Sequence, residues 1–288
     1  MAITYKAGNR LTGVSTGGTA NGVVEKVELA YEDDFLTYAN QTTANAAWEP
    51  ASDGAGHRVN ITNDNLELEK TVSGTTNYAV VHDLGASVVN TTAWTLRFSA
   101  DVTLNSGSNG NWCYIGLFNS DESVGGGDNQ NMIAVAFQND GVNTKFWGVA
   151  GVGKNVNAGN SDYFAASGNA TLTSTKYYIQ LRRLTATSMD IMIYSDLNYS
   201  TPHVKMILSG SSLSLGDLRY IKFANNTSGA SGSIDIVMDD VEFYNGVALT
   251  TGDISLLPAD GTNENGSTFI ETDTGKEYIL NYGAWIEK

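Results

Sequence analysis

Short segments with β-strand patterning, separated by turn residues, make up most of this chain. In Trp94–Leu104 apolar and polar residues alternate, as in a strand with one face in a core. The 31 glycines, together with many Asn, Ser and Thr, supply turns, and there are only three prolines. Nowhere do three turns of 3.6-residue periodicity occur, so we expect an all-β fold without helices. The expected strands are 66–71, 78–82, 94–104, 113–118, 132–138, 146–149, 176–184, 188–194, 220–224 and 234–244.

The length of 288 residues predicts one large domain with small flanking segments, because a β-sandwich can reach roughly 200–250 residues. We expect a tether with an edge strand over 1–30, a β-sandwich over 31–246 and a linker over 247–266. The last segment, 267–288, predicts three short strands that are too few to bury a core alone. It should therefore pack on the main domain or on a second copy, which favours a homo-oligomer.

The charge balance excludes several classes of partner. The net charge of −15 repels phosphate backbones and anionic membranes, so we expect no nucleic-acid partner.

No apolar stretch approaches ~20 residues, so no membrane span is expected. The first residues lack the apolar core of a signal peptide. A single cysteine, Cys113, rules out an intramolecular disulfide bond.

Two acidic doublets, Asp33-Asp34 and Asp239-Asp240, lie near the two ends of the main domain. Where the opening and closing strands of a sandwich lie side by side, such carboxylates meet, and a cation or protonation makes this tolerable. Adjacent strand residues face opposite ways, so one acid of each doublet should point at an ion. We predict structural calcium with Asp34 and Asp240 as first ligands and Asp33 and Asp239 next. Solvated strand ends are the alternative.

The span from Glu32 to Asn245 resembles the concanavalin A-like, or laminin G-like, jelly-roll superfamily. The resemblance rests on Asp33-Asp34-Phe35 followed by Trp48, on the strand segment 94–98 and on the closing segment 236–244. It implies two stacked antiparallel sheets, frequent glycan binding and often a structural calcium.

The two ends of the chain resemble those of virion or tail-fibre-like proteins from environmental, especially marine, viruses. The resemblance rests on residues 1–10 and on a closing segment, 266–286, that contains Phe-Ile-Glu-Thr-Asp-Thr-Gly-Lys and then Trp285. It implies a structural protein located on a virion or an extracellular surface.

Aromatic and amide side chains in or beside long Gly/Asn-rich loops form the candidate ligand-binding surface. Aromatic rings stack on the C–H faces of sugars, and amides hydrogen-bond their hydroxyl groups. For any single aromatic residue, core packing is the alternative, and Trp48 and Trp94 are expected in the core. The candidate ligand-binding residues are Trp112, Tyr114, Trp147 and Tyr163, with Asn111, Asn129 and Asn131.

No catalytic motif is present in the sequence. The Glu-x-Asp-x-x-Glu motif of glucanases with this fold is absent, and His57, His82 and His203 have no metal-ligand spacing. We therefore expect a non-enzymatic protein that attaches a particle or fibre to surface glycans or a host receptor. A polysaccharide hydrolase or lyase on the same fold is one alternative, and a purely architectural, self-assembling subunit is another.

Overall fold

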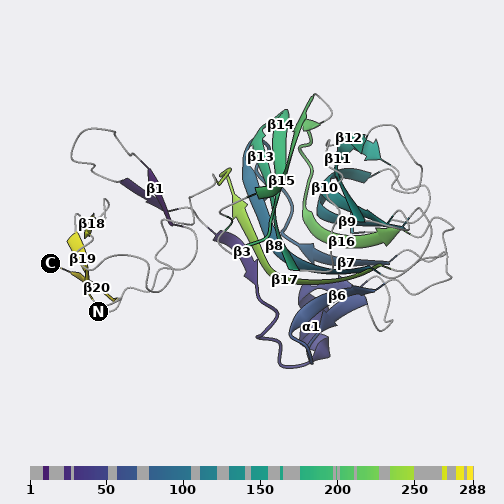
Figure 1. Cartoon of the computed structure of the whole chain (residues 1–288), viewed down its shortest axis with the longest axis horizontal. Coiled ribbons are helices and arrows are strands. Elements are labelled where there is room, and N and C mark those ends of the chain that lie inside the picture. Colours follow the sequence, from purple (N-terminus) through teal and green to yellow (C-terminus); the bar gives the residue numbers. More distant parts are fainter. Residues whose placement is uncertain are drawn as a thin grey trace.

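The computed structural model shows a sandwich of two antiparallel β-sheets (Figure 1). At several strand ends, and in the strands outside 29–249, it describes the backbone alone. The described residues are 9–12, 23–26, 29–50, 57–69, 78–104, 111–121, 130–139, 144–154, 163–164, 176–196, 199, 202–210, 213–226, 234–249, 268–270, 277–281 and 284–287.

One layer, called the β9 sheet, has seven strands in the order β12-β11-β10-β9-β16-β7-β4. Every neighbouring pair in it is antiparallel. Its strands are β4 (Glu49–Pro50), β7 (Tyr78–Asp83), β9 (Asn111–Phe118), β10 (Gln130–Asn139), β11 (Thr144–Lys154), β12 (Tyr163–Phe164) and β16 (Tyr220–Asn226).

The other layer, called the β8 sheet, has the order β15-β14-β13-β8-β17-β6-β5, with β3 beside β17. The first half of β17 pairs with β6, and its second half pairs with β3. The strands are β3 (Leu29–Asp33), β5 (His57–Asn60), β6 (Asn65–Glu69), β8 (Trp94–Leu104), β13 (Lys176–Thr185), β14 (Ser188–Tyr194), β15 (Pro202–Ser209) and β17 (Ile234–Asn245).

The hydrophobic core fills the space between the two sheets. Leu96 and Phe98 of β8 are fully buried, and the Phe98 ring meets Phe223 of β16 edge to face at 5.9 Å between centroids. Trp48 and Trp94 are also buried, as the sequence predicts. Fully burying one such side chain stabilises the fold by roughly 1.5–3 kcal/mol, so this layer of contacts dominates the stability.

The outward-facing side of β8 is also covered, although its residues are polar. Arg97 is 1% exposed, its Nε donates to Gln180 Oε1 at 2.6 Å, and its guanidinium lies 4.7 Å from the ring centre of Tyr199. The segment after β17 covers the same face, since the Leu249 N–H donates to Thr95 Oγ1 at 2.9 Å. Buried polar side chains therefore pair with one another on this face.

The expected strands are all found, and 94–104 and 188–194 coincide with β8 and β14. The expectation of no helix is wrong, because α1 spans Gln41–Ala47. Asn40 caps it: its side chain accepts from the Thr43 N–H at 3.1 Å, and Thr43 Oγ1 receives the Asn40 N–H. Seven residues are too few for helical periodicity to be visible in the sequence.

The terminal strands form two small sheets that pair with neither large sheet. Strands β1 (Asn9–Thr12) and β2 (Val23–Lys26) pair with each other. The three strands expected near the C-terminus are β18 (Thr268–Ile270), β19 (Glu277–Asn281) and β20 (Ala284–Glu287), paired in that order. Within the described part of the chain, no helix is long and apolar enough to span a membrane.

Candidate functional site

The opening and closing strands of the sandwich lie side by side. In the antiparallel pair of β3 and β17, Val241 is opposite Asp33 and Glu242 is opposite Glu32. The two acidic doublets, which are some two hundred residues apart in the sequence, therefore share one neighbourhood. This confirms the arrangement that the sequence predicts.

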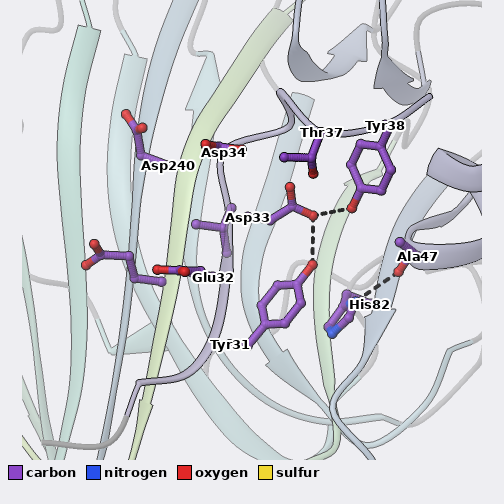
Figure 2. A pocket seen from close by; sticks show the side chains of 11 residues that line it. Tyr31, Glu32, Asp33, Asp34, Thr37, Tyr38, Ala47, His82 and Asp240 are labelled. Atoms are coloured by element: carbon purple, nitrogen blue, oxygen red, sulfur yellow. Dashed lines mark hydrogen bonds between the residues drawn. The ribbon is translucent and has the colours of Figure 1, made fainter. Parts of the chain in front are cut away.

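A pocket of about 470 Å³ lies where β3 ends, within the range of small-molecule sites (Figure 2). Its aromatic side chains are Tyr31, Tyr38 and His82, and Ala47 and Val241 also line it. Its carboxylates are those of Glu32, Asp33, Asp34, Asp240 and Glu242, and Thr37 adds a hydroxyl group.

Asp33 holds the inner side of the pocket together. Its Oδ2 accepts three hydrogen bonds, from the Tyr31 hydroxyl at 2.8 Å, from Trp48 Nε1 at 2.7 Å and from the Tyr38 hydroxyl. Its Oδ1 accepts one, from the Phe35 N–H at 2.8 Å. Burial, and then the nearby Asp33 carboxylate, raise the pKa of both tyrosines above the ordinary value. Both hydroxyls therefore stay protonated and donate to Asp33.

His82 and Tyr31 form an aromatic wall. Their rings stack with centroids 3.7 Å apart and an interplanar angle of 24°. His82 Nδ1 lies 2.9 Å from the Ala47 carbonyl oxygen, which can only accept, so Nδ1 carries the proton and Nε2 is left as an acceptor (Figure 2). Burial lowers the pKa of His82, which favours this neutral ring.

The outer side of the pocket carries exposed acids. Glu32, Asp34 and Asp240 are exposed, whereas burial raises the pKa of the less exposed Glu242. Outside the lining, Lys176 Nζ lies 3.7 Å from a carboxylate oxygen of Asp240 and 3.7 Å from one of Asp239. No lysine or arginine is among the lining residues that the structure describes.

The backbone at the two acidic doublets takes left-handed conformations. Phe35 has φ 59° and Asp240 has φ 53°. The register between β17 and β8 shifts between Asp239 and Glu242, which is a local bulge. Such conformations cost of order 1–3 kcal/mol and concentrate at functional sites.

The predicted calcium ligands have protein partners in the structure. Asp33 is turned inward and already accepts four hydrogen bonds, and Asp239 and Asp240 share the Lys176 ammonium. In the described ranges no three His, Cys, Asp or Glu residues are grouped so as to hold a metal ion. Calcium needs six to eight oxygen ligands. Calcium binding through Asp34 and Asp240 stays a prediction from the sequence.

The predicted loop aromatics are only partly described. Tyr114 is fully buried, which favours core packing for this residue, and Trp147 is half-buried beside it. Asn131 Nδ2 donates to both carboxylate oxygens of Asp217, at 2.9 and 2.8 Å. The side chains of Trp112, Tyr163, Asn111 and Asn129 lie outside the described residues.

The sequence does not mark Tyr31, Tyr38 or His82 as site residues. One signal was available, since Tyr31 and Asp33 are two apart in a strand and must face the same side. His82 and Tyr38 gave no such signal, because only the pairing of distant strands brings them to Asp33.

No protein-family model and no curated protein matches this sequence. Solved structures do match it. The carbohydrate recognition domain of Emp46p in its metal-free form is 14% identical and covers 77% of this chain and 100% of its own, with a TM-score of 0.51. The CBM2 module of Lactobacillus casei BL23 phage J-1 evolved Dit is 11% identical and covers 77% of this chain and 98% of its own, with a TM-score of 0.50.

These likenesses establish the class of fold. The chain is a two-sheet antiparallel jelly-roll sandwich of the concanavalin A-like type, as the resemblance of the span from Glu32 to Asn245 implied.

Proposed function

We propose that this protein is a non-enzymatic carbohydrate-recognition module that binds a saccharide in the pocket beside β3. The observation that carries the proposal is the pocket itself, which combines an aromatic wall with several hydrogen-bond acceptors. The fold supports it, since the structural neighbours include the carbohydrate recognition domain of Emp46p.

The chemistry of the lining suits a sugar. A pyranose presents a C–H face, which can lie on an outer ring face of the stacked Tyr31–His82 pair. It also presents many hydroxyl donors, and carboxylates among the lining residues can accept from them. Each carboxylate can accept more than one hydroxyl group, so one sugar ring can be oriented by few residues.

The state of Glu242 supports binding over hydrolysis. A hydrolase needs a protonated acid and a carboxylate on either side of the glycosidic bond. Glu242 is the carboxylic acid of the pocket whose pKa burial raises, but its Oε2 already accepts from the Tyr244 hydroxyl at 2.8 Å. Arg97 opposes this shift and favours the charged form. Glu242 is therefore poorly suited to act as the general acid.

The biological role that we propose is attachment of a viral particle or fibre to surface glycans, at a virion or extracellular surface. The resemblance of the chain ends supports this role, as does a structural neighbour from a phage protein. We also propose a homo-oligomer, since low-affinity sugar sites gain from multivalency. Light scattering should show dissociation on deletion of 267–288 if that segment forms the contact.

A glycan array followed by calorimetry tests the binding function. Because Glu32 and Asp34 are exposed, the double variant Glu32→Ala/Asp34→Ala should fold and lose at least about tenfold in affinity. Asp64→Ala, at an exposed turn outside the pocket lining, is the control and should bind normally.

Chelator and calcium arms of the same array test the calcium prediction. Reducing-end release from polysaccharides tests the enzymatic alternative. Absence of binding to any saccharide, with or without calcium, would contradict the proposal.

A further inference from the structure

An asparagine that is followed by glycine, Asn245-Gly246, stands at the end of β17. Such a pair deamidates readily in an open chain, because glycine has no side chain to hinder attack by its own backbone nitrogen. The Gly246 nitrogen attacks Cγ of Asn245, the bond from Cγ to Nδ2 breaks, and ammonia leaves. Solvent water then opens the cyclic imide to aspartate or isoaspartate.

In the folded protein, hydrogen bonds hold both reacting groups. Asn245 Oδ1 accepts from the Asn90 N–H at 2.8 Å, and its Nδ2 donates to the Val88 carbonyl at 2.7 Å. The attacking nitrogen is also engaged, since the Gly246 N–H donates to the Ala93 carbonyl at 3.0 Å. Attack requires the side-chain amide to rotate and the nitrogen to lose its proton, so these three bonds must break first. All three partners belong to residues 88–93, called the 88–93 loop.

The 88–93 loop can open without unfolding of the sandwich. Asn90 Oδ1 holds its turn by accepting from the N–H groups of Thr92 and Ala93, at 2.8 and 3.0 Å. Val89 is buried in the core, whereas Val88, Asn90 and Thr92 are exposed. An exposed segment with few buried contacts opens at a lower free energy than the whole fold.

The reaction product does not fit the closed loop. In aspartate a carboxylate oxygen replaces Nδ2 and faces the Val88 carbonyl, so two acceptors meet without a proton between them. Isoaspartate also adds a backbone carbon just before residues 247–249, which bond to the buried Thr95 and Arg182. Deamidation during one opening therefore prevents the loop from closing as before.

From these observations we propose that Asn245 is a deamidation site that the fold keeps closed and that reacts when the 88–93 loop opens. Because the ammonia is lost to solvent, the reaction runs one way. It converts a transient opening into a permanent loss of the contacts at the end of β17. This site is separate from the proposed saccharide pocket and does not depend on it.

Peptide mass spectrometry tests the protection. The full chain and a synthetic peptide of residues 241–250 are incubated side by side at a mildly alkaline pH, and deamidation at Asn245 is followed with time. We expect the folded protein to react at least about a hundredfold more slowly than the peptide, because only the open fraction reacts. A rate within about threefold of that of the peptide would overturn the proposal.

Two matched turn variants test the role of the 88–93 loop. Asn90→Ala removes the turn bonds inside the loop but leaves Asn245 unchanged, so it should raise the deamidation rate at least about tenfold. Asn60→Ala removes a turn of the same kind between β5 and β6, where Oδ1 accepts from the Thr62 N–H at 2.9 Å, and should leave the rate unchanged. An equal rise in both variants would overturn the proposal, because the rate would then follow the stability of the whole fold.

The variant Asn245→Asp reproduces the aspartate product and tests the one-way step. Backbone hydrogen exchange at residues 88–93 should be at least about tenfold faster in this variant than in the wild type. Asn63→Asp adds the same charge at an exposed turn and should leave this exchange unchanged. Unchanged exchange in Asn245→Asp, or equal acceleration in the two variants, would overturn the one-way step.

Discussion

Asp33 is the residue on which the geometry of the pocket depends. It is 8% exposed and accepts hydrogen bonds from Tyr31, Tyr38, Trp48 and the Phe35 N–H. In Asp33→Asn an amide NH₂ replaces one carboxylate oxygen, so at least one buried donor loses its acceptor. We expect the free energy of unfolding in urea to fall by about 2–3 kcal/mol.

The neighbouring Asp34→Asn is the matched control. Asp34 is exposed, and its Oδ1 accepts only a local bond from the Leu36 N–H at 3.1 Å. The same chemical change should therefore shift the free energy of unfolding by no more than about 0.5 kcal/mol. Equal losses in the two variants would show that the Asp33 network does not hold this turn.

The neutral state of His82 should make stability depend on pH. Burial lowers its pKa in the folded protein below the unfolded value of 6.5. At a pH between the pKa of His82 in the folded protein and its pKa in the unfolded protein, the unfolded state binds more protons. The free energy of unfolding should therefore fall as the pH drops below about 6.5, by at most about 1.4 kcal/mol per pH unit. His82→Phe keeps a ring against Tyr31 and should lose this slope.

Urea unfolding at pH 7.5 and 5.5, in the wild type and in His82→Phe, measures how much the free energy of unfolding changes with pH. Burial raises the pKa of Glu242 and Asp239, so these acids contribute a slope of the opposite sign, which is common to both proteins and cancels in the comparison. His203→Phe, at an exposed position in β15, tests whether loss of any histidine has this effect. An identical slope in the wild type and His82→Phe would contradict the assignment.

At the scale of the elements, Gly116 sets how closely β9 and β10 approach. A Cβ at this position would lie 2.1 Å from the Ile133 carbonyl oxygen and 2.5 Å from Ala134 Cα. Backbone atoms cannot move aside cheaply, so Gly116→Ala should destabilise the fold by about 3 kcal/mol or more. Gly216→Ala is the control, because its Cβ would meet only a Thr91 methyl group at 3.9 Å and should be nearly neutral in thermal unfolding.

Strands with clear alternation could be located from the sequence. In β8 the inward residues Leu96 and Phe98 alternate with Arg97, and the predicted bounds coincide with the observed ones. Strand β15 was missed although Met206 and Leu208 face inward, because Ile207 between them is 69% exposed and masks the alternation. Single exposed apolar residues are common on protein surfaces, and the local sequence pattern does not show that this isoleucine lies on the edge strand of the sheet.

The helix α1 shows a second limit of local patterning. Its capping residues Asn40 and Thr43 are polar residues of the kind found in any turn of this chain. Only Ala44 is buried within it, so there is no apolar stripe to recognise. The helix is fixed by tertiary contacts, such as the bond from Gln41 Nε2 to the Val59 carbonyl at 2.9 Å.

At the scale of the whole molecule, the sequence predicted one part of the candidate site, which is the meeting of the two acidic doublets. The meeting of the two acidic doublets follows from the topology of a sandwich whose first and last strands pair. The direction of each side chain did not follow, since Asp33 turns inward to Trp48 and the two tyrosines. The aromatic wall was also not predictable, because it joins Tyr31 of one sheet to His82 of the other.

The folded unit should be residues 29–249. The buried core side chains that the structure describes lie between Phe35 and Leu249, and the described strands of both large sheets lie within 29–249. The segment after β17 belongs to it, because the Val247 carbonyl accepts from Thr95 Oγ1 at 3.0 Å and the Leu249 carbonyl accepts from Arg182 Nη1. We expect a 29–249 chain to unfold cooperatively in urea with nearly the stability of the full chain.

A chain that ends at Asn245 makes this boundary testable. It keeps every strand of both large sheets but leaves buried Thr95 and Arg182 without the 247–249 segment. Because removing the partner of a buried polar group costs about 1–3 kcal/mol, the 29–245 chain should lose about 2–4 kcal/mol relative to 29–249. Equal stability of these two chains would mean that the covered outer face of β8 contributes little. A 29–249 chain that fails to fold would mean that the terminal segments complete the sandwich.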